Sequence, residues 1–187
     1  MNLNTLYRRW VAVNALGELF GLGLTLGIGF SLIASFDVSG VGGILLAFTV
    51  AVLSGTIEAA IIGLLQWWAM HPWFPTISRL RWWLGTLGGA LTAYVLGYLP
   101  STLMDLSQAT SAGQAPVAEP PQWLVLLLAA ALGAVAGAVF SFAQWLAMRG
   151  KVKGAAVWIP ANMLAWFIGM PLIFLGIDLA QRLEPLW

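Results

Sequence analysis

The sequence contains no cysteine, a single histidine and only two lysines. Without cysteine the chain has no disulfide, thiolate zinc site, iron–sulfur cluster or cysteine nucleophile. One histidine, His71, is too few for a bis-histidine haem or a histidine-built metal site. The two lysines, Lys151 and Lys153, lie together in a polar stretch, so we expect no retinal-type Schiff base.

Charge is scarce in both signs. Charged residues make up 8% of the 187 residues, against about 25% in an ordinary soluble domain, and the mean hydropathy is +0.89. A water-soluble globule is therefore excluded. The net charge of +1 provides no basic surface for phosphates, which excludes nucleic-acid binding. We find no nucleotide loop, zinc-binding helix or serine-triad context either, so we expect no enzyme.

Long apolar runs dominate the chain. A bilayer core about 30 Å thick needs roughly 20 apolar residues per helix. The sequence therefore predicts an all-α polytopic membrane bundle, a single transmembrane domain over residues 1–187. Its five predicted helices cover residues 10–36, 41–70, 82–99, 123–148 and 156–179, and a polar stretch predicts an external loop over 100–122. The first run extends well past the apolar core of a signal peptide, so we expect it in the mature protein.

Basic residues gather at one end of the predicted bundle. Because Lys and Arg near span ends are retained on the cytoplasmic side, we expect a cytoplasmic N-terminus and a C-terminus on the opposite side of a bacterial inner or thylakoid membrane. The basic residues at the N-terminus and in the second and fourth connections are Arg8, Arg9, Arg79, Arg81, Arg149, Lys151 and Lys153, and the acidic residues expected at or near the other face are Asp37, Asp105, Glu119, Asp178 and Glu184.

Tryptophans follow the same boundary. Amphipathic indoles favour a membrane interface, so we interpret the cluster as an interfacial belt. The alternative is an aromatic ligand cage. The residues concerned are Trp10, Trp67, Trp68, Trp73, Trp82, Trp83, Trp145 and Trp158.

Two helix types recur along the chain. The run Gln-Trp-Trp-Ala-Met at 66–70 returns as Gln-Trp-Leu-Ala-Met at 144–148. The odd-numbered spans begin with a tryptophan that is followed four residues later by Asn14, Thr86 or Asn162. We interpret this pattern as an internal parallel repeat of a two-helix hairpin, in about two and a half copies. A parallel repeat argues against the inverted repeat of rocking transporters.

Small residues occupy matching positions in these odd-numbered spans. In lipid no hydrophobic force drives helices together, and small residues permit close backbone approach. We therefore expect tight helix packing, with a ligand groove as the alternative. The aligned residues are Gly85, Gly89 and Ala93 in the third span, Ala161, Ala165 and Gly169 in the fifth, and Gly17 and Gly21 in the first, where Val13 breaks the pattern.

Four amide side chains lie below the basic boundary, roughly 7–14 Å deep at about 1.5 Å per residue. They are Asn14, Gln66, Gln144 and Asn162. An unpaired amide in hydrocarbon is costly, so we expect an interhelical hydrogen-bonded layer. The alternative is that an amide oxygen ligates a cation or a pigment magnesium. A cofactor bound by these amides or by His71 would be a chlorophyll-type pigment, a carotenoid or a lipid.

Two acidic residues depart from the repeat. Glu18 and Glu58 lie roughly 13–18 Å deep, and no Lys or Arg lies within the predicted spans near them. We expect them to face each other and to share a proton, because two close carboxyls in a low dielectric cannot both ionise cheaply. Three interpretations stay open: a protonated structural pair, a proton or cation pathway, and contact with a partner subunit, lipid or pigment.

The repeated Gln-Trp helix ends and the Trp-x-x-x-Asn/Thr helix starts resemble those of small multi-span membrane proteins of cyanobacteria and other photosynthetic bacteria. The resemblance covers most of the spans but not the 100–122 loop. His71 and the prolines Pro72 and Pro75 depart from the basic residue that typically follows the motif in that group. The group has no established chemistry, so the resemblance implies no catalytic residue.

We therefore expect a non-catalytic accessory or structural subunit of a larger membrane complex, photosynthetic or respiratory. Its partners would be the lipid bilayer and other membrane subunits. The alternative is a small channel, transporter or substrate-capturing membrane subunit that uses Glu18 and Glu58 for a proton or cation.

Overall fold

The computed structural model describes residues 2–110 and 120–182, and within them every regular element is a helix. Four segments are long and apolar enough to cross a membrane, Leu3–Ile33, Gly40–Met70, Gln122–Met148 and Ala155–Gly176. This confirms a multi-pass membrane protein. The elements are α1 (Leu3–Ile33), α2 (Gly40–Met70), α3 (Arg79–Thr110), α4 (Gln122–Met148), the 3-10 helix η1 (Ala155–Val157) and α5 (Trp158–Arg182).

Polar side chains cap the start of α1 and form the turn between α1 and α2. The Asn2 side chain accepts a hydrogen bond from the Asn4 backbone N–H at 2.9 Å and caps α1. Between α1 and α2, the Asp37 carboxylate accepts from the Ser39 backbone N–H at 2.8 Å. Gly40 follows with a φ of +67°, a left-handed conformation that glycine adopts without the steric cost of a Cβ. The connection is therefore a tight turn.

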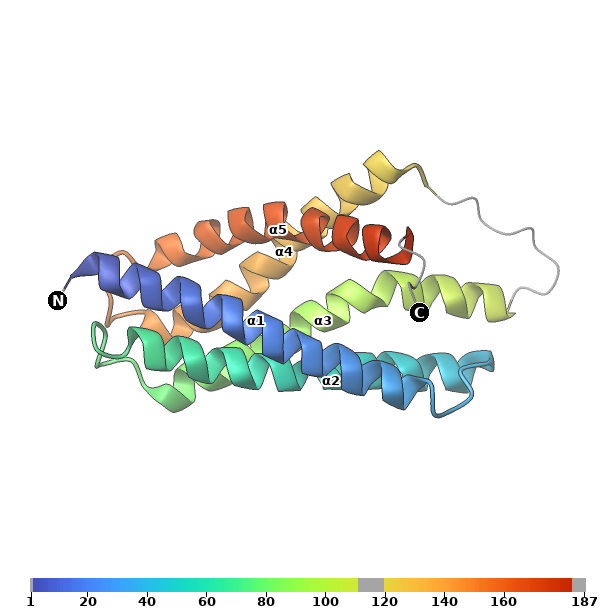
Figure 1. The fold of residues 1–187 in the computed structure, drawn as a ribbon, viewed down its shortest axis with the longest axis horizontal. Helices are drawn as coiled ribbons and strands as arrows, with labels where there is room; N and C mark the ends of the chain where they lie inside the picture. Colours follow the sequence, from blue (N-terminus) through green and yellow to red (C-terminus); the bar gives the residue numbers. More distant parts are fainter. Residues whose placement is uncertain (1, 111–119, 183–187) are drawn as a thin grey trace.

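The helices are arranged in chain order, so that α2, α3 and α4 each pack against the preceding and the following helix. Among the described residues the backbones of α1 and α5 do not approach each other, so a seam separates the first and last helices, and the Trp10–Trp158 ring contact crosses it. The N-terminus and the α2–α3 and α4–α5 connections lie at one end of the molecule (Figure 1). We call this the basic end, because it carries Arg8, Arg9, Arg79, Arg81, Arg149, Lys151 and Lys153.

Glycines bring the backbones of neighbouring helices together. A Cβ on Gly89 of α3 would lie 2.9 Å from the Phe140 Cα of α4. One on Gly137 of α4 would lie 2.7 Å from the Asn162 carbonyl oxygen of α5. Such close approach maximises dispersion contact where lipid supplies no hydrophobic drive. The predicted tight packing is present at these interfaces.

The third predicted span, 82–99, needs correction. It belongs to the longer helix α3 and is not among the four segments apolar enough to cross a membrane. The predicted loop 100–122 is wrong over its first part, since α3 continues through Pro100 to Thr110. The side chains of Ser101 and Thr102 both donate to the Tyr98 carbonyl, at 3.0 and 2.9 Å. Residues 111–119, with Glu119, and also Glu184, lie outside the described residues.

A buried apolar cluster lies at the basic end. Five buried residues form it, and tryptophans of α1, α2 and α5 pack against it. The N-terminal end of α1, the two connections and the start of α5 therefore meet in one core. Its buried members are Met70, Ile77, Trp82, Ala147 and Met148.

Candidate functional site

The two membrane glutamates meet on the inner side of α1 and α2. Their carboxyl groups lie close enough to interact with each other, and two close carboxyls in a low dielectric favour a proton on one of them. Glu58 is buried, with 9% of its surface exposed, and Glu18 is half-buried. The two acids are neighbours, as expected, and the shared proton stays a prediction.

A tyrosine from α3 completes this cluster. The Tyr94 hydroxyl donates to Glu58 Oε2, and the Tyr98 ring stacks on Tyr94 with the centroids 6.0 Å apart. Gly55 of α2 faces the Tyr94 ring, and a Cβ there would overlap it. Glycine at this position thus allows the phenol to reach Glu58. Glu18, Glu58 and Tyr94 form what we call the carboxyl–tyrosine cluster.

The amide side chains form a second polar group, nearer the basic end. Gln66 Nε2 donates to Asn14 Oδ1 at 2.8 Å, and Gln144 Nε2 donates to Gln66 Oε1 at 3.0 Å. Gln144 Nε2 also donates to Thr86 Oγ1 at 3.0 Å. Trp158 Nε1 closes the chain by donating to Gln144 Oε1 at 2.8 Å. The predicted interhelical layer is present and joins all five long helices.

Asn162 takes a different place from the other three amides. Its Nδ2 donates to the Trp158 carbonyl at 2.8 Å, within its own helix. Asn14 makes the same bond to the Trp10 carbonyl at 2.7 Å, and the Thr86 hydroxyl bonds to the Trp82 carbonyl at 2.9 Å. The three predicted Trp-x-x-x-Asn/Thr starts therefore share one local hydrogen bond.

The amide oxygens are largely engaged by the protein itself. Asn14 Oδ1, Gln66 Oε1 and Gln144 Oε1 each accept a hydrogen bond from a neighbouring helix. A polar group satisfied in this way stabilises the bundle, whereas an unsatisfied one in hydrocarbon destabilises it. The layer in this form acts as an interhelical clamp.

Three of the predicted belt tryptophans converge at the basic end. The Trp10 and Trp158 ring centroids lie 5.5 Å apart, Trp82 and Trp158 6.1 Å apart, and Trp10 and Trp82 6.5 Å apart. Others lie at the surface, among them Trp68, which carries the Arg9 guanidinium 4.3 Å above its ring. The cluster is thus part interface and part buried aromatic core.

His71 and Asp178 lie away from both polar groups. The His71 ring stacks on Trp67 with a centroid distance of 4.3 Å, at the end of α2. Asp178 accepts a hydrogen bond from Gln122 Nε2 at 3.2 Å. Within residues 2–110 and 120–182, no three His, Cys, Asp or Glu side chains come together in a way that could hold a metal ion.

Comparison of the chain with protein-family models, with curated proteins and with solved structures finds no match. The resemblance of the helix ends to those of cyanobacterial membrane proteins accordingly stays a prediction.

Sequence reasoning missed Tyr94 as the partner of the carboxyl pair. Tyr94 lies twelve residues beyond Trp82, and Glu58 lies twelve residues before Met70. Counting from the basic end, at about 1.5 Å per residue, places both side chains about 18 Å along their helices. This equal distance from the basic end was the sequence signal that could have identified Tyr94 as a partner of Glu58.

Proposed function

We propose that the protein is a non-catalytic accessory subunit of a larger membrane complex and that α5 is its docking helix. The proposal rests on whether the small residues that align between α1, α3 and α5 pack against another helix. In α1 and α3 these residues receive the next helix of the chain, whereas in α5 no helix among the described residues lies against them.

The first two cases define the contact. In α1, a Cβ on Gly17 would lie 3.0 Å from the Ile62 side chain of α2, and one on Gly21 would lie 3.1 Å from the Glu58 Cα. In α3, a Cβ on Gly85 would lie 2.8 Å from the Ala143 carbonyl oxygen of α4. Each of these faces is closed by a returning helix.

The third case is open. Ala161 and Ala165 are exposed, and a Cβ on Gly169 would meet nothing within 4 Å. No residue in the most apolar stretch of α5 is buried. We call Ala161, Ala165 and Gly169 the α5 small-residue face. Small residues at this spacing let a second transmembrane helix approach closely, so a helix from another subunit fits where α2 and α4 stand in the first two hairpins.

The proposed hairpin repeat explains why we expect another helix at the α5 small-residue face. Three helix starts share the same side-chain bond to a tryptophan carbonyl, and their tryptophans form one cluster. Both observations support an origin by duplication of a Trp-helix and Gln-Trp-helix hairpin. In that scheme the docking partner supplies the equivalent of a third returning helix.

The proposal includes the orientation of the chain in the membrane and the kind of membrane that holds it. The concentration of arginine and lysine at the basic end supports a cytoplasmic N-terminus. The membrane would be a bacterial inner or thylakoid membrane, and the complex photosynthetic or respiratory.

Gentle purification of the natively expressed protein tests the proposal. Extraction in a mild detergent, followed by measurement of molecular mass, co-purifying chains and the absorption spectrum, should place the chain in a larger particle. An Ala165→Trp variant should be released from that particle, because the indole fills the docking face. A matched Leu164→Trp variant, on an exposed position outside the face, should stay bound. A wild-type protein that runs alone contradicts the proposal.

The carboxyl–tyrosine cluster favours a second candidate function. Tyr94 donates a hydrogen bond to Glu58, and Glu18 lies beside Glu58 in the bundle. The lysine or arginine nearest along the chain to any of the three is Arg9, nine residues before Glu18. Ionisable residues within a membrane commonly mark ion and proton pathways. A small channel, transporter or substrate-capturing subunit would use this cluster to bind a proton or cation.

Liposome flux assays separate the two candidates. If the second is right, purified protein carries a proton or cation current that Glu58→Gln abolishes. Asp37→Asn, the same change at an exposed turn, leaves the current intact. Absence of flux under any imposed gradient removes the transport function and leaves the docking proposal standing.

A further inference from the structure

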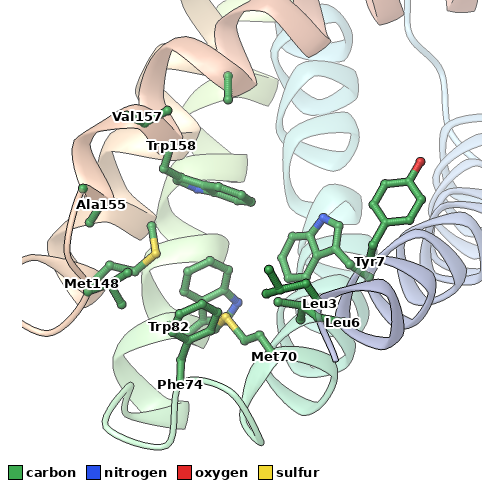
Figure 2. Close-up of a pocket in the computed structure, with 14 residues that line it drawn as sticks. Leu3, Leu6, Tyr7, Met70, Phe74, Trp82, Met148, Ala155, Val157 and Trp158 are labelled. Atoms are coloured by element: carbon green, nitrogen blue, oxygen red, sulfur yellow. The ribbon is translucent and has the colours of Figure 1, made fainter. Parts of the chain in front are cut away.

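A cavity of about 450 Å³ opens at the basic end, between the start of α1 and the start of α5. Its volume falls within the range of about 300–1,000 Å³ that small-molecule sites occupy. The lining is almost wholly apolar and includes all three members of the tryptophan cluster (Figure 2). Further lining residues are Leu6 of α1, Met70 of α2 and Ala155 of η1.

One polar atom of this lining lacks a partner. The Trp82 side chain is fully buried, and its indole Nε1 has no hydrogen-bond acceptor. Trp158 differs, because its Nε1 donates to Gln144. Trp82 and Met70 both line the cavity (Figure 2) and belong to the same buried apolar cluster. Methionine is flexible and repacks readily, so a rotamer change of Met70 gives an acceptor access to Nε1.

The rim of the cavity is positively charged. Lys151 and Lys153 are exposed on either side of the lining residue Val152. The three segments at this end, 2–10, 71–78 and 149–157, contain no acidic residue. An apolar slot with a buried donor and a basic rim is complementary to a molecule with an apolar chain, a carbonyl oxygen and an anionic head.

We propose that this cavity is a binding site for an anionic phospholipid. One acyl chain occupies the apolar slot, an ester carbonyl oxygen accepts the Trp82 Nε1 hydrogen, and the phosphate group lies at the rim beside Lys151 and Lys153. The lipid enters from the bilayer through the seam between α1 and α5. The site adjoins the α5 small-residue face, because Ala161 belongs to both, but lipid binding does not require the proposed docking partner.

Native mass spectrometry of the whole chain tests the site. The protein is reconstituted in nanodiscs of phosphatidylglycerol and phosphatidylcholine at equal mole fraction, and retained lipid is counted after mild release. We expect one phosphatidylglycerol per chain. The preference over phosphatidylcholine should be about fivefold or more, since each basic residue near a surface adds about that factor for an anionic lipid.

Two variants test the apolar slot of the cavity, and one tests its basic rim. Trp82→Phe keeps the ring and removes the donor, so phosphatidylglycerol retention should fall about threefold to tenfold, the contribution of one hydrogen bond. Ala155→Phe fills the cavity and should abolish retention. The double variant Lys151→Gln, Lys153→Gln should equalise the two lipids. Trp123→Phe, an exposed tryptophan far from the cavity in the chain, is the matched control and should change nothing.

Selective phosphatidylglycerol retention that Trp82→Phe weakens supports the site. Equal retention of both lipids, or retention that Trp82→Phe does not alter, overturns it. So does a retained apolar molecule that is not a phospholipid, such as a pigment seen by its absorbance. If Ala155→Phe fails to fold, Trp82→Phe still decides, because it removes no hydrogen bond within the protein.

Discussion

Replacing Gln144 by leucine should weaken the bundle more than any surface change of similar size. The side chain is fully buried, donates to Gln66 and Thr86, and accepts from Trp158. Interhelical hydrogen bonds in membranes average about 0.6 kcal/mol each and reach about 1.7. Loss of the three bonds should therefore lower the free energy of unfolding by about 2 kcal/mol.

Equilibrium unfolding in mixed dodecyl sulfate and dodecyl maltoside micelles, followed by circular dichroism, measures this loss. A double-mutant cycle with Gln66→Leu isolates the Gln144–Gln66 bond, with an expected coupling of about 0.6 kcal/mol. Thr49→Val is the control, because the Thr49 hydroxyl is exposed and bonds only to the Leu45 carbonyl of its own helix. If Gln144→Leu costs no more than this control, the interhelical layer is not a clamp.

Two further perturbations follow from the geometry. Gly133→Ala should destabilise the α4–α5 contact by about 1–3 kcal/mol, because the added Cβ would overlap the Trp166 carbonyl oxygen. The control is Gly88→Ala, whose Cβ would meet nothing within 4 Å and which should leave the free energy of unfolding unchanged in the same assay. Equal effects would contradict the packing account. At the α1–α2 turn, hydrogen bonds from the Ser39 backbone and hydroxyl hold the pKa of Asp37 below its ordinary value, so the turn's stabilisation is present above about pH 4 and lost as pH falls further. The NMR resonance of the Ser39 backbone amide should therefore shift only below about pH 4. A titration midpoint above that pH would refute the lowered pKa of Asp37.

The sequence located most of the helices because lipid imposes simple rules. Continuous apolar runs and basic ends predicted α2 and α4 to within one residue of their bounds. The predicted end of α3 was wrong because proline and polar residues usually stop a helix. Pro100 removes only one backbone donor, and no residue with positive φ follows it to turn the chain before Thr110.

The candidate sites were predicted in part, and the limit is again physical. Depth along a helix can be counted, so the amide layer and the Glu18–Glu58 pair were expected. Rotation about the axis cannot be counted in helices that are apolar all round, because no polar stripe marks the outer face. The tryptophan cavity depends on that rotation, and on the separation of the α1 and α5 backbones, which no local pattern reports.

The absence of native cysteine makes the central claim directly measurable. A single Ala165→Cys variant in native membranes, treated with a short thiol-to-amine cross-linker, reports only what lies against the α5 small-residue face. The account predicts one cross-linked protein product of defined mass, which the Leu164→Cys control lacks. Cross-linking that is equal at the two positions, or absent from both while lipid-soluble reagents label the introduced thiol of the Ala165→Cys variant freely, would contradict the docking function.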